Sequence, residues 1–217
     1  MITMQSFVFN PFSENTYVVF DETKEAVIID PGCYEQNEKA ELDEYITQQD
    51  LTIKYLLNTH CHIDHVLGND HVKEKYKVPF LIHPLEEKVL FAVKSYAPNY
   101  GFSMYKEALP DQFLADNDIV RFGNTLLNVL FVPGHSPGHI AFYDKQEKVI
   151  FSGDVLFKGS IGRTDLPGGD FDTLIKSIHQ KIFTLPDGVI AHSGHGLPTT
   201  IGEEKISNPF CGVNIRQ

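Results

Sequence analysis

Three histidines and one aspartate fall within the short segment from His60 to His65, and this cluster constrains the fold more than any other stretch. The apolar run 53–57 in front of it is typical of a buried strand. His60 and His62, two positions apart, should leave the end of that strand pointing the same way. The apolar spacing then becomes helical, and Asp64 is suited to a helix cap. The sequence therefore predicts that a strand end and a helix start offer metal ligands to a common point.

Three later segments share this design, in which an apolar strand ends in a glycine-containing turn beside a histidine or an aspartate. They are 131–135, 150–154 and 189–196, and they carry His135, Asp154 and His195. Rigid scaffolds often present functional side chains at strand ends, and glycine permits the tight turns that direct them. With the first cluster they supply nitrogen and oxygen ligands without a thiolate. This set fits one three-histidine site and one Asp/His/His site that share a carboxylate.

The rest of the chain alternates between strand and helix periods. Strands are predicted at 2–9, 16–20, 26–30, 53–57, 78–83, 119–122, 125–132, 140–144, 149–151 and 189–191, and helices at 35–49, 85–96 and 170–185. Two runs of strands, each followed by helix, indicate two packed sheets with helices outside. The length of 217 residues fits one domain, residues 1–217.

The net charge and the cysteine content indicate which partners and which cellular compartment to expect. The formal net charge is −11 and no basic stripe is present, so we expect no nucleic-acid partner. Three scattered cysteines favour free thiols in a reducing compartment. The first seven residues lack the features of a secretory signal, and no apolar run is long enough to span a membrane. We therefore expect a cytoplasmic protein with no membrane partner; the oligomeric state stays open.

The pattern His-x-His-x-Asp-His, followed by a separate His, Asp and His, resembles the metallo-β-lactamase superfamily. The resemblance extends from the turn 30–32 to the turn 194–196, and all seven ligand positions are filled. It implies an α/β fold, an αββα four-layer sandwich of two mixed β-sheets with outer helices. It also implies that one metal is held by His60, His62 and His135, a second by Asp64, His65 and His195, with Asp154 bridging them.

Within that family, segments 159–165 and 199–210 are similar to the compact hydrolases related to glyoxalase II. This implies a binuclear hydrolase of anionic thioesters such as S-2-hydroxyacylglutathione, with zinc as the first choice of metal and iron or manganese as alternatives. Two dications about 3.5–4 Å apart can share a water and lower its pKa from about 16 toward neutrality. Asp64 and Asp154 are then the catalytic carboxylates. Because the chain ends soon after Phe210, the glutathione-binding helical domain of full-length glyoxalase II is not expected, and the thiol carrier stays open.

Persulfide dioxygenases resemble the chain as well, and they imply a different reaction. In that alternative, one iron is held by His60, His135 and Asp154 as a two-histidine, one-carboxylate triad. We favour the hydrolase because His139 stands where those dioxygenases usually carry a cysteine. Family nucleases are disfavoured by the acidic charge, and periplasmic lactamases by the missing signal. An idle metal site in a non-enzymatic protein is the remaining alternative.

Several other residues could have either a functional or a purely structural role. Arg163 either binds the substrate carboxylate or pairs with Asp165. We expect His139 to make a core hydrogen bond and Cys61 to turn away from the metal, and the aromatic stretch 96–113 either packs into the core or covers the site. His71, His83 and His179 are expected to be ordinary partly buried or surface residues. His192, three residues before His195, is an alternative ligand to it, and we favour His195 because glycines flank it.

Overall fold

The computed structural model describes residues 1–213. Contacts along the chain divide it into two compact units. The first comprises Met1–Leu114 and Arg121–Leu126, and the second comprises Ala115–Val120 and the chain from Leu127 onward. Each unit has its own hydrophobic core. The expectation of a single domain stays a prediction.

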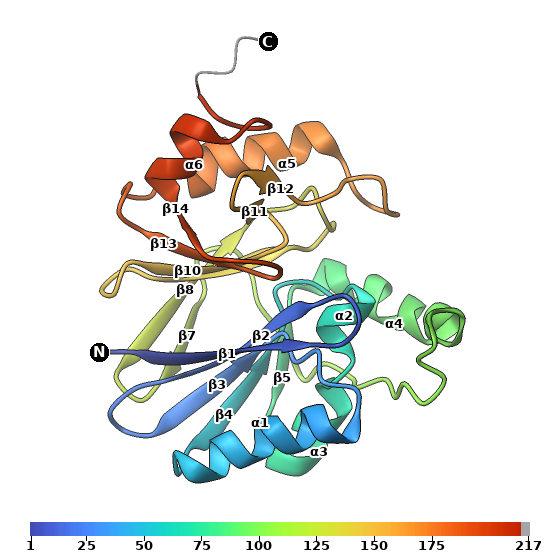
Figure 1. The fold of residues 1–217 in the computed structure, drawn as a ribbon. Helices are drawn as coiled ribbons and strands as arrows, with labels where there is room; N and C mark the ends of the chain where they lie inside the picture. Colours follow the sequence, from blue (N-terminus) through green and yellow to red (C-terminus); the bar gives the residue numbers. More distant parts are fainter. Residues whose placement is uncertain (214–217) are drawn as a thin grey trace. The chain divides into compact units, whose positions relative to one another are not determined.

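The first unit contains a six-stranded mixed sheet with the order β1-β2-β3-β4-β5-β6 (Figure 1). The strands are β1 Thr3–Phe9, β2 Glu14–Phe20, β3 Glu25–Ile29, β4 Thr52–Leu57, β5 Phe80–Ile82 and β6 Gln112–Phe113. The first three are antiparallel neighbours, whereas β3 to β6 are parallel to one another. The carboxyl ends of β3 and β4 therefore meet at one edge of the sheet.

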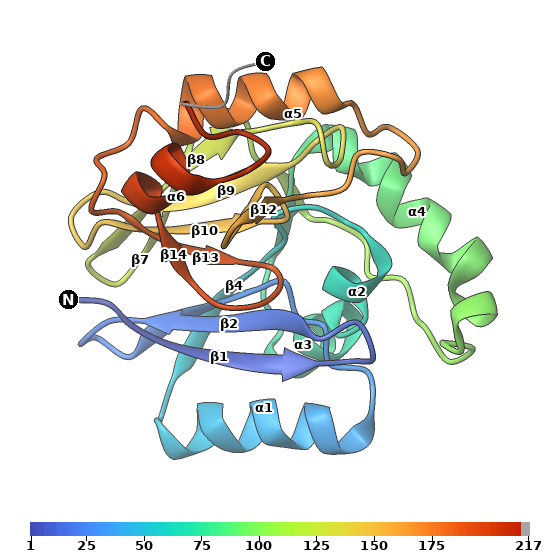
Figure 2. The same ribbon diagram turned by 45° about the horizontal axis from the view of Figure 1, so that its top comes forward.

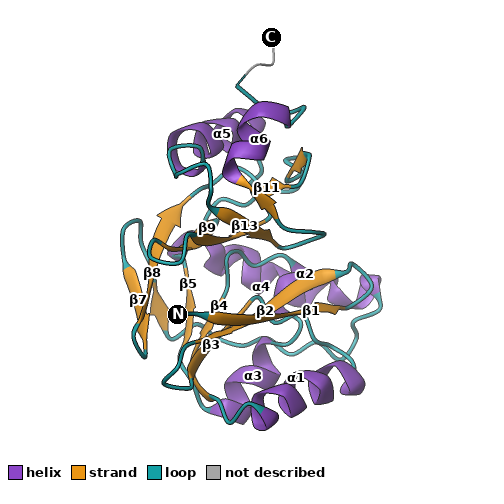
Figure 3. Cartoon of the chain, turned by 60° about the vertical axis from the view of Figure 1, so that its left-hand side comes forward, coloured by secondary structure: helices purple, strands orange, loops and turns teal. Residues whose placement is uncertain are grey.

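Helices cover this sheet and contribute buried side chains to its core. They are α1 Gln36–Gln48, α2 Ile63–Val66, α3 Asn69–Tyr76 and α4 Glu87–Tyr96, with α1 and α3 on the same face of the sheet (Figure 3). A capping box between Glu35 and Glu38 begins α1, which satisfies backbone N–H groups of its first turn. Leu42 and Ile46 of α1 are buried in the core.

The second sheet is also mixed and has the order β14-β13-β10-β9-β8-β7. Its strands are β7 Ile119–Phe122, β8 Thr125–Phe131, β9 Ile140–Asp144, β10 Val149–Gly153, β13 Ile190–Ser193 and β14 Thr199–Thr200, and a separate hairpin is formed by β11 Leu156–Phe157 and β12 Ser160–Ile161. Helices α5 Phe171–Ser177 and α6 Ile201–Ser207 lie on one face of this sheet (Figure 2). Leu174, Ile178 and Ile182 pack there against Val132 and Ile150.

The predicted elements are largely present, with differences at their ends. The helix predicted at 170–185 consists of α5 followed by a π-helical turn at Ile178–Ile182, and α6 was not predicted. The helix after the histidine cluster is interrupted between α2 and α3 at Gly68, whose N–H donates to the Pro31 carbonyl. A Cβ at this glycine would lie 2.5 Å from Cys33 Sγ, so the chain passes too close for a larger residue. Within residues 1–213 no helix is both long and apolar enough to cross a membrane.

Candidate metal centre

The predicted ligands of the first unit lie where β3 and β4 end together. These parallel strands pair up to Ile29 and Leu57. Asp30 follows β3 directly, and the segment 58–62 leads from β4 to α2. The prediction that a strand end and a helix start carry the cluster is thus confirmed for this unit. Asp64 is not the helix cap as predicted, because His62 occupies that position and Asp64 lies in the first turn.

Asp30 forms hydrogen bonds with the residues just before the histidine cluster and with one of its histidines. Its Oδ1 accepts hydrogen bonds from Thr59 N at 2.7 Å and Asn58 Nδ2 at 3.2 Å. Its Oδ2 accepts from Thr59 Oγ1 at 2.6 Å and lies 3.2 Å from His65 Nδ1. With both oxygens engaged, Asp30 acts as an orienting residue. A carboxylate at Nδ1 directs the opposite nitrogen, Nε2, toward a metal.

The three clustered histidines of the first unit, His60, His62 and His65, converge. The rings of His60 and His65 are 4.1 Å apart between centroids, and those of His60 and His62 are 4.8 Å apart. His60 and His65 are fully buried, and His62 and Asp64 are partly exposed. Asp64 Oδ2 lies 3.7 Å from His65 Nε2. One unit thus brings together four of the seven predicted ligands.

Cys61 is not part of this group, as predicted. Its side chain is buried in the hydrophobic core, and burial raises the pKa of its thiol well above the usual value. Its backbone N–H donates a 2.7 Å hydrogen bond to the buried carboxylate of Glu86. Glu86 therefore fixes the backbone between His60 and His62, a role that nothing in its sequence context indicated.

The buried charges of the first unit fit a bound cation. Glu14 and Asp30 are almost completely buried, and neither pairs with a lysine or arginine among the described residues. Burial raises the pKa of Glu14 well above its usual value. Buried carboxylates are costly unless a cation compensates them. Imidazole and carboxylate donors are also the ligands that zinc, iron and manganese accept.

The predicted ligands of the second unit lie at one edge of the second sheet. Both β8 and β10 are antiparallel to β9, and β13 is parallel to β10. The strands β8, β10 and β13 therefore run in the same direction and end at the same edge. His135, Asp154 and His195 follow these three strand ends, which explains why the sequence pattern repeats at each.

Asp154 lies between His135 and His195. Its Oδ2 is 3.6 Å from His135 Nε2 and 3.5 Å from His195 Nε2. The Nδ1 atom of His135 is 2.7 Å from the Arg163 carbonyl oxygen, which requires a proton on Nδ1 and directs Nε2 toward Asp154. One carboxylate thus faces both imidazoles, the position that a bridging ligand needs.

His139 forms a hydrogen bond with the backbone of Asp154. It is fully buried, and its Nε2 accepts a hydrogen bond from the backbone N–H of Asp154 at 3.1 Å. The prediction of a core hydrogen bond is confirmed. The bond is made to the residue between the two imidazoles, so His139 helps to place that carboxylate.

Gly162 allows the loop after β12 to pass against these residues. A Cβ at this position would lie 1.9 Å from the Asp154 carbonyl oxygen and 3.0 Å from His135 Nδ1. We expect Gly162→Ala to lower the free energy of unfolding by about 1–3 kcal/mol through overpacking and to weaken metal binding. Gly188→Ala is the matched control, because a Cβ there meets nothing within 4 Å. Thermal unfolding and metal titration measure both effects, and equal behaviour of the two variants would contradict this role of Gly162.

Other predicted residues have ordinary partners. Arg163 forms the alternative ion pair with Asp165, at 2.7 Å from Nε to Oδ1, and this hydrogen bond lowers the pKa of Asp165 to about 2. His192 stacks on Phe151, and burial lowers its pKa to about 4. The three remaining histidines bond to local groups: His71 to Asp43, His83 to the Leu85 N–H and His179 to the Cys211 carbonyl. The aromatic stretch is mixed, since Phe102 is buried and Tyr100 is exposed.

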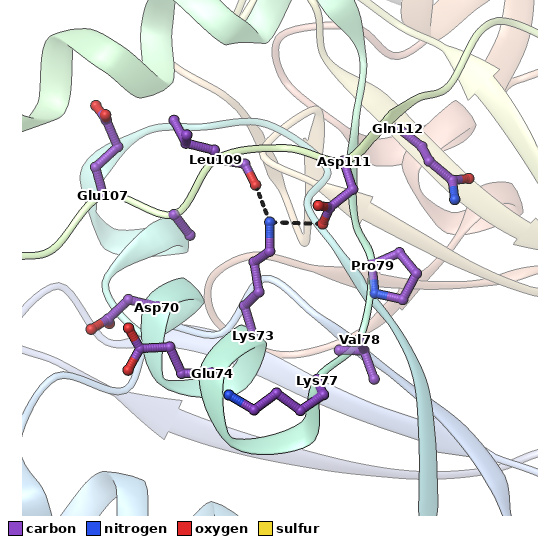
Figure 4. Close-up of a pocket in the computed structure, with 11 residues that line it drawn as sticks. Asp70, Lys73, Glu74, Lys77, Val78, Pro79, Glu107, Leu109, Asp111 and Gln112 are labelled. Carbon is purple, nitrogen blue, oxygen red and sulfur yellow. Dashed lines mark hydrogen bonds and ion pairs between the residues drawn. The ribbon is translucent and has the colours of Figure 1, made fainter.

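A hollow of about 670 Å³ in the first unit is lined by none of the predicted ligands. Figure 4 shows Lys73 reaching across it. The Nζ atom of Lys73 is 2.8 Å from Asp111 Oδ2 and also donates to the Leu109 carbonyl. Asp70, Glu74 and Glu107 add negative charge. The lysine is thus engaged by the protein itself, and the hollow carries no constellation of catalytic groups.

Comparison with known proteins identifies the family. The model of the Metallo-beta-lactamase superfamily matches residues 9–195. The chain belongs to the metallo-β-lactamase superfamily. The resemblance found in the sequence is confirmed. The family is one of metal-binding hydrolases, and the matched range contains all seven predicted ligands.

Two relatives differ in their named activities. Hydroxyacylglutathione hydrolase GloC of Haemophilus influenzae is 42% identical over 201 residues, which is 92% of this chain and 93% of that protein. The mitochondrial persulfide dioxygenase ETHE1 of Mus musculus is 34% identical over 207 residues, which is 93% of this chain and 73% of that protein. Both candidate activities of the sequence analysis thus occur among the relatives.

Solved structures confirm the fold. BLEG-1, a B3 metallo-β-lactamase, has a TM-score of 0.88 at 39% identity, covering 96% of this chain and 99% of that chain. TTHA1623, solved in a di-iron-bound form, has a TM-score of 0.84 at 36% identity, covering 95% and 99%. The predicted α/β class, with two mixed sheets and helices in the metallo-β-lactamase fold, is therefore correct.

Proposed function

We propose that the protein is a binuclear metal-dependent thioester hydrolase acting on S-2-hydroxyacylglutathione-like compounds. The observation that carries the proposal is the position of Asp154 Oδ2, 3.6 Å from His135 Nε2 and 3.5 Å from His195 Nε2. A carboxylate facing two imidazoles is what a metal-bridging ligand requires. The 42% identity to a hydroxyacylglutathione hydrolase supports the substrate class.

In this proposal the two halves of the centre hold two divalent cations. The first cation would be held by His60, His62 and His135, the second by Asp64, His65 and His195, and both by Asp154. The family match across both units supports this assembly, as does the relative that binds two irons. Zinc remains our first choice, with iron or manganese as alternatives, because these ligands accept all three.

The chain's own groups then have distinct tasks. Bound dications would supply an activated water and polarise the acyl carbonyl. Asp30 and the Arg163 carbonyl oxygen hold His65 and His135 in fixed orientations. The leaving thiol has a pKa of about 8.5, so it can depart as a thiolate without a strong general acid. Arg163 is exposed, and we propose that it exchanges Asp165 for a substrate carboxylate.

The charge of the protein and of the proposed metal centre indicates which substrates and partners it would bind. A cationic centre in a protein of net charge −11 attracts small anions locally and offers nothing to a nucleic acid. We propose a small anionic thioester as the partner, and neither nucleic acid nor membrane. The three cysteines are free thiols, which agrees with the cytoplasmic location that we propose.

A persulfide dioxygenase is the second candidate, favoured by the 34% identity to ETHE1. It would need one iron, held by His60, His135 and Asp154, and it would have no use for Asp64. Asp64 nevertheless lies 3.7 Å from His65 Nε2, and His65 is anchored by Asp30. Because persulfide dioxygenases retain much of the same motif, these ligands alone do not separate the two activities. We favour the hydrolase because the identity to GloC, 42%, exceeds the identity to ETHE1, 34%.

The two candidates can be separated by their co-substrates. The purified protein should release thiol from S-lactoylglutathione under argon as fast as in air. With glutathione persulfide it should consume no oxygen in an oxygen electrode. Thiol-dependent oxygen uptake by a protein containing one iron per chain would instead establish the dioxygenase.

A further inference from the structure

Glu14 is a fully buried carboxylate for which the proposed chemistry has no task. It begins β2, and its side chain has no exposed surface. Its Oε2 accepts a hydrogen bond from Thr16 Oγ1 at 2.8 Å. Its Oε1 receives no hydrogen bond from residues 1–213 and lies 3.9 Å from His65 Nδ1. The unbonded oxygen therefore faces a proposed metal ligand.

The surrounding backbone is shaped to admit this carboxylate. A Cβ on Gly32 would lie 2.1 Å from Glu14 Oε2 and 2.7 Å from the Asp64 carbonyl oxygen. Thr16 Oγ1 accepts from the Gly32 N–H at 2.8 Å and so fixes the turn beside Glu14. The side chain is thus held in a defined place by the turn that follows Asp30.

Hydrogen bonding alone does not explain Glu14. The single proton on His65 Nδ1 is taken by Asp30 Oδ2 at 3.2 Å, which leaves Glu14 Oε1 without a donor. A buried carboxylate with one oxygen unbonded and no cationic side chain beside it is costly. With Asp64 Oδ2 at 3.7 Å from Nε2, three carboxylates surround the His65 ring. A cation held by Nε2 of this imidazole would stabilise the ionised form of these carboxylates.

We infer that Glu14 sets the occupancy of the metal position formed by Asp64 and His65. This inference rests on the proposed binuclear centre. A carboxylate behind a ligating imidazole stabilises the cation through the ring, and loss of such a partner typically weakens metal binding 10- to 100-fold. Glu14 is thus a positioning and charge-compensating residue, and it keeps the centre binuclear, as hydrolysis requires.

The test compares metal binding of the wild type and Glu14→Gln. Apo-protein is titrated with Zn²⁺ against a chromophoric chelator, and Co²⁺ absorption reports each site separately. We expect two ions in the wild type. In Glu14→Gln one affinity should be unchanged and the other weakened by about 10- to 100-fold. Glu14→Asp, which keeps the charge, should recover most of that loss and serves as the second variant if the amide fails to fold.

Glu204→Gln is the matched control in the second unit. Glu204 is equally buried but accepts hydrogen bonds from Gly159 N and Thr199 Oγ1, so both metal affinities should stay within about twofold, the scatter expected for a residue that does not support a ligand. Thermal unfolding in a chelator adds a readout that a purely structural role would not give. Glu14→Gln should be at least as stable as the wild type without metal and less stable with it.

The outcomes separate the inference from the proposed function. A Glu14→Gln variant that binds both ions as the wild type does overturns the role of Glu14 and leaves the hydrolase intact. The same holds if this variant loses equal stability with and without metal. A wild type that binds one ion overturns the binuclear centre itself.

Discussion

Asp64→Ala should reduce thioester turnover by about a thousandfold while the protein stays folded. Removing this ligand should empty the second metal position, and a loss of about 4 kcal/mol of transition-state stabilisation corresponds to that factor. The fold should persist because the Asp64 backbone carbonyl, which accepts from Asn10 Nδ2, is unchanged. Steady-state kinetics with S-lactoylglutathione, together with circular dichroism, measure both effects.

Asp70→Ala is the control for that substitution. Asp70 also lies in the first turn of a helix, α3, and is also partly exposed, so it loses the same favourable interaction with the helix N-terminus. It contacts none of the proposed ligands and should keep wild-type kcat/KM. An Asp64→Ala enzyme that retained more than about a tenth of the turnover would exclude Asp64 as a ligand, because a loss of about 1.4 kcal/mol or less is too small for one.

Asp30→Asn should lower both stability and metal affinity. An amide keeps only one of the two acceptor oxygens, so either the donors at Oδ1, Thr59 N and Asn58 Nδ2, or those at Oδ2, Thr59 Oγ1 and His65 Nδ1, would face an NH2 group. We expect a loss of about 3 kcal/mol in the free energy of unfolding. His65 also loses its carboxylate partner, which should weaken metal binding about 10- to 100-fold. Urea unfolding of the apo-protein and zinc titration measure the two effects.

Asp43→Asn is the control that separates the loss of stability from the loss of metal affinity. Asp43 is partly buried between α1 and α3. It accepts from Tyr76 OH at 2.6 Å and from Lys75 Nζ at 2.6 Å. Its replacement should also destabilise the first unit but leave zinc affinity unchanged. If Asp30→Asn lost stability and kept full affinity, Asp30 would be a structural residue only.

The sequence predicted the candidate ligands because each stands at the end of an apolar strand. His135, Asp154 and His195 could be grouped from the turns that precede them. The predicted ends of helices and strands were less accurate where contacts between distant residues determine them. The helix after the histidine cluster is interrupted at Gly68, for example, because the chain there passes close to Cys33. The short strands of the β11–β12 hairpin have too few residues for a period to show.

The supporting residues were missed for a related reason. Asp30 stands in a turn that the sequence shows, but its three partner residues, Asn58, Thr59 and His65, lie about 30 residues further along the chain. Glu14 starts an otherwise buried strand, and a charged residue in such a strand was the available signal. The Arg163 contact to His135 is made by a backbone carbonyl, for which the side chain gives no clue.

The metal stoichiometry of the active wild-type protein decides whether the centre is binuclear. Metal content by mass spectrometry should be measured on the same sample as S-lactoylglutathione turnover, with zinc added stepwise to apo-protein. We expect turnover to rise to its full value only as the second ion per chain binds. Full turnover with one ion per chain would contradict a binuclear centre.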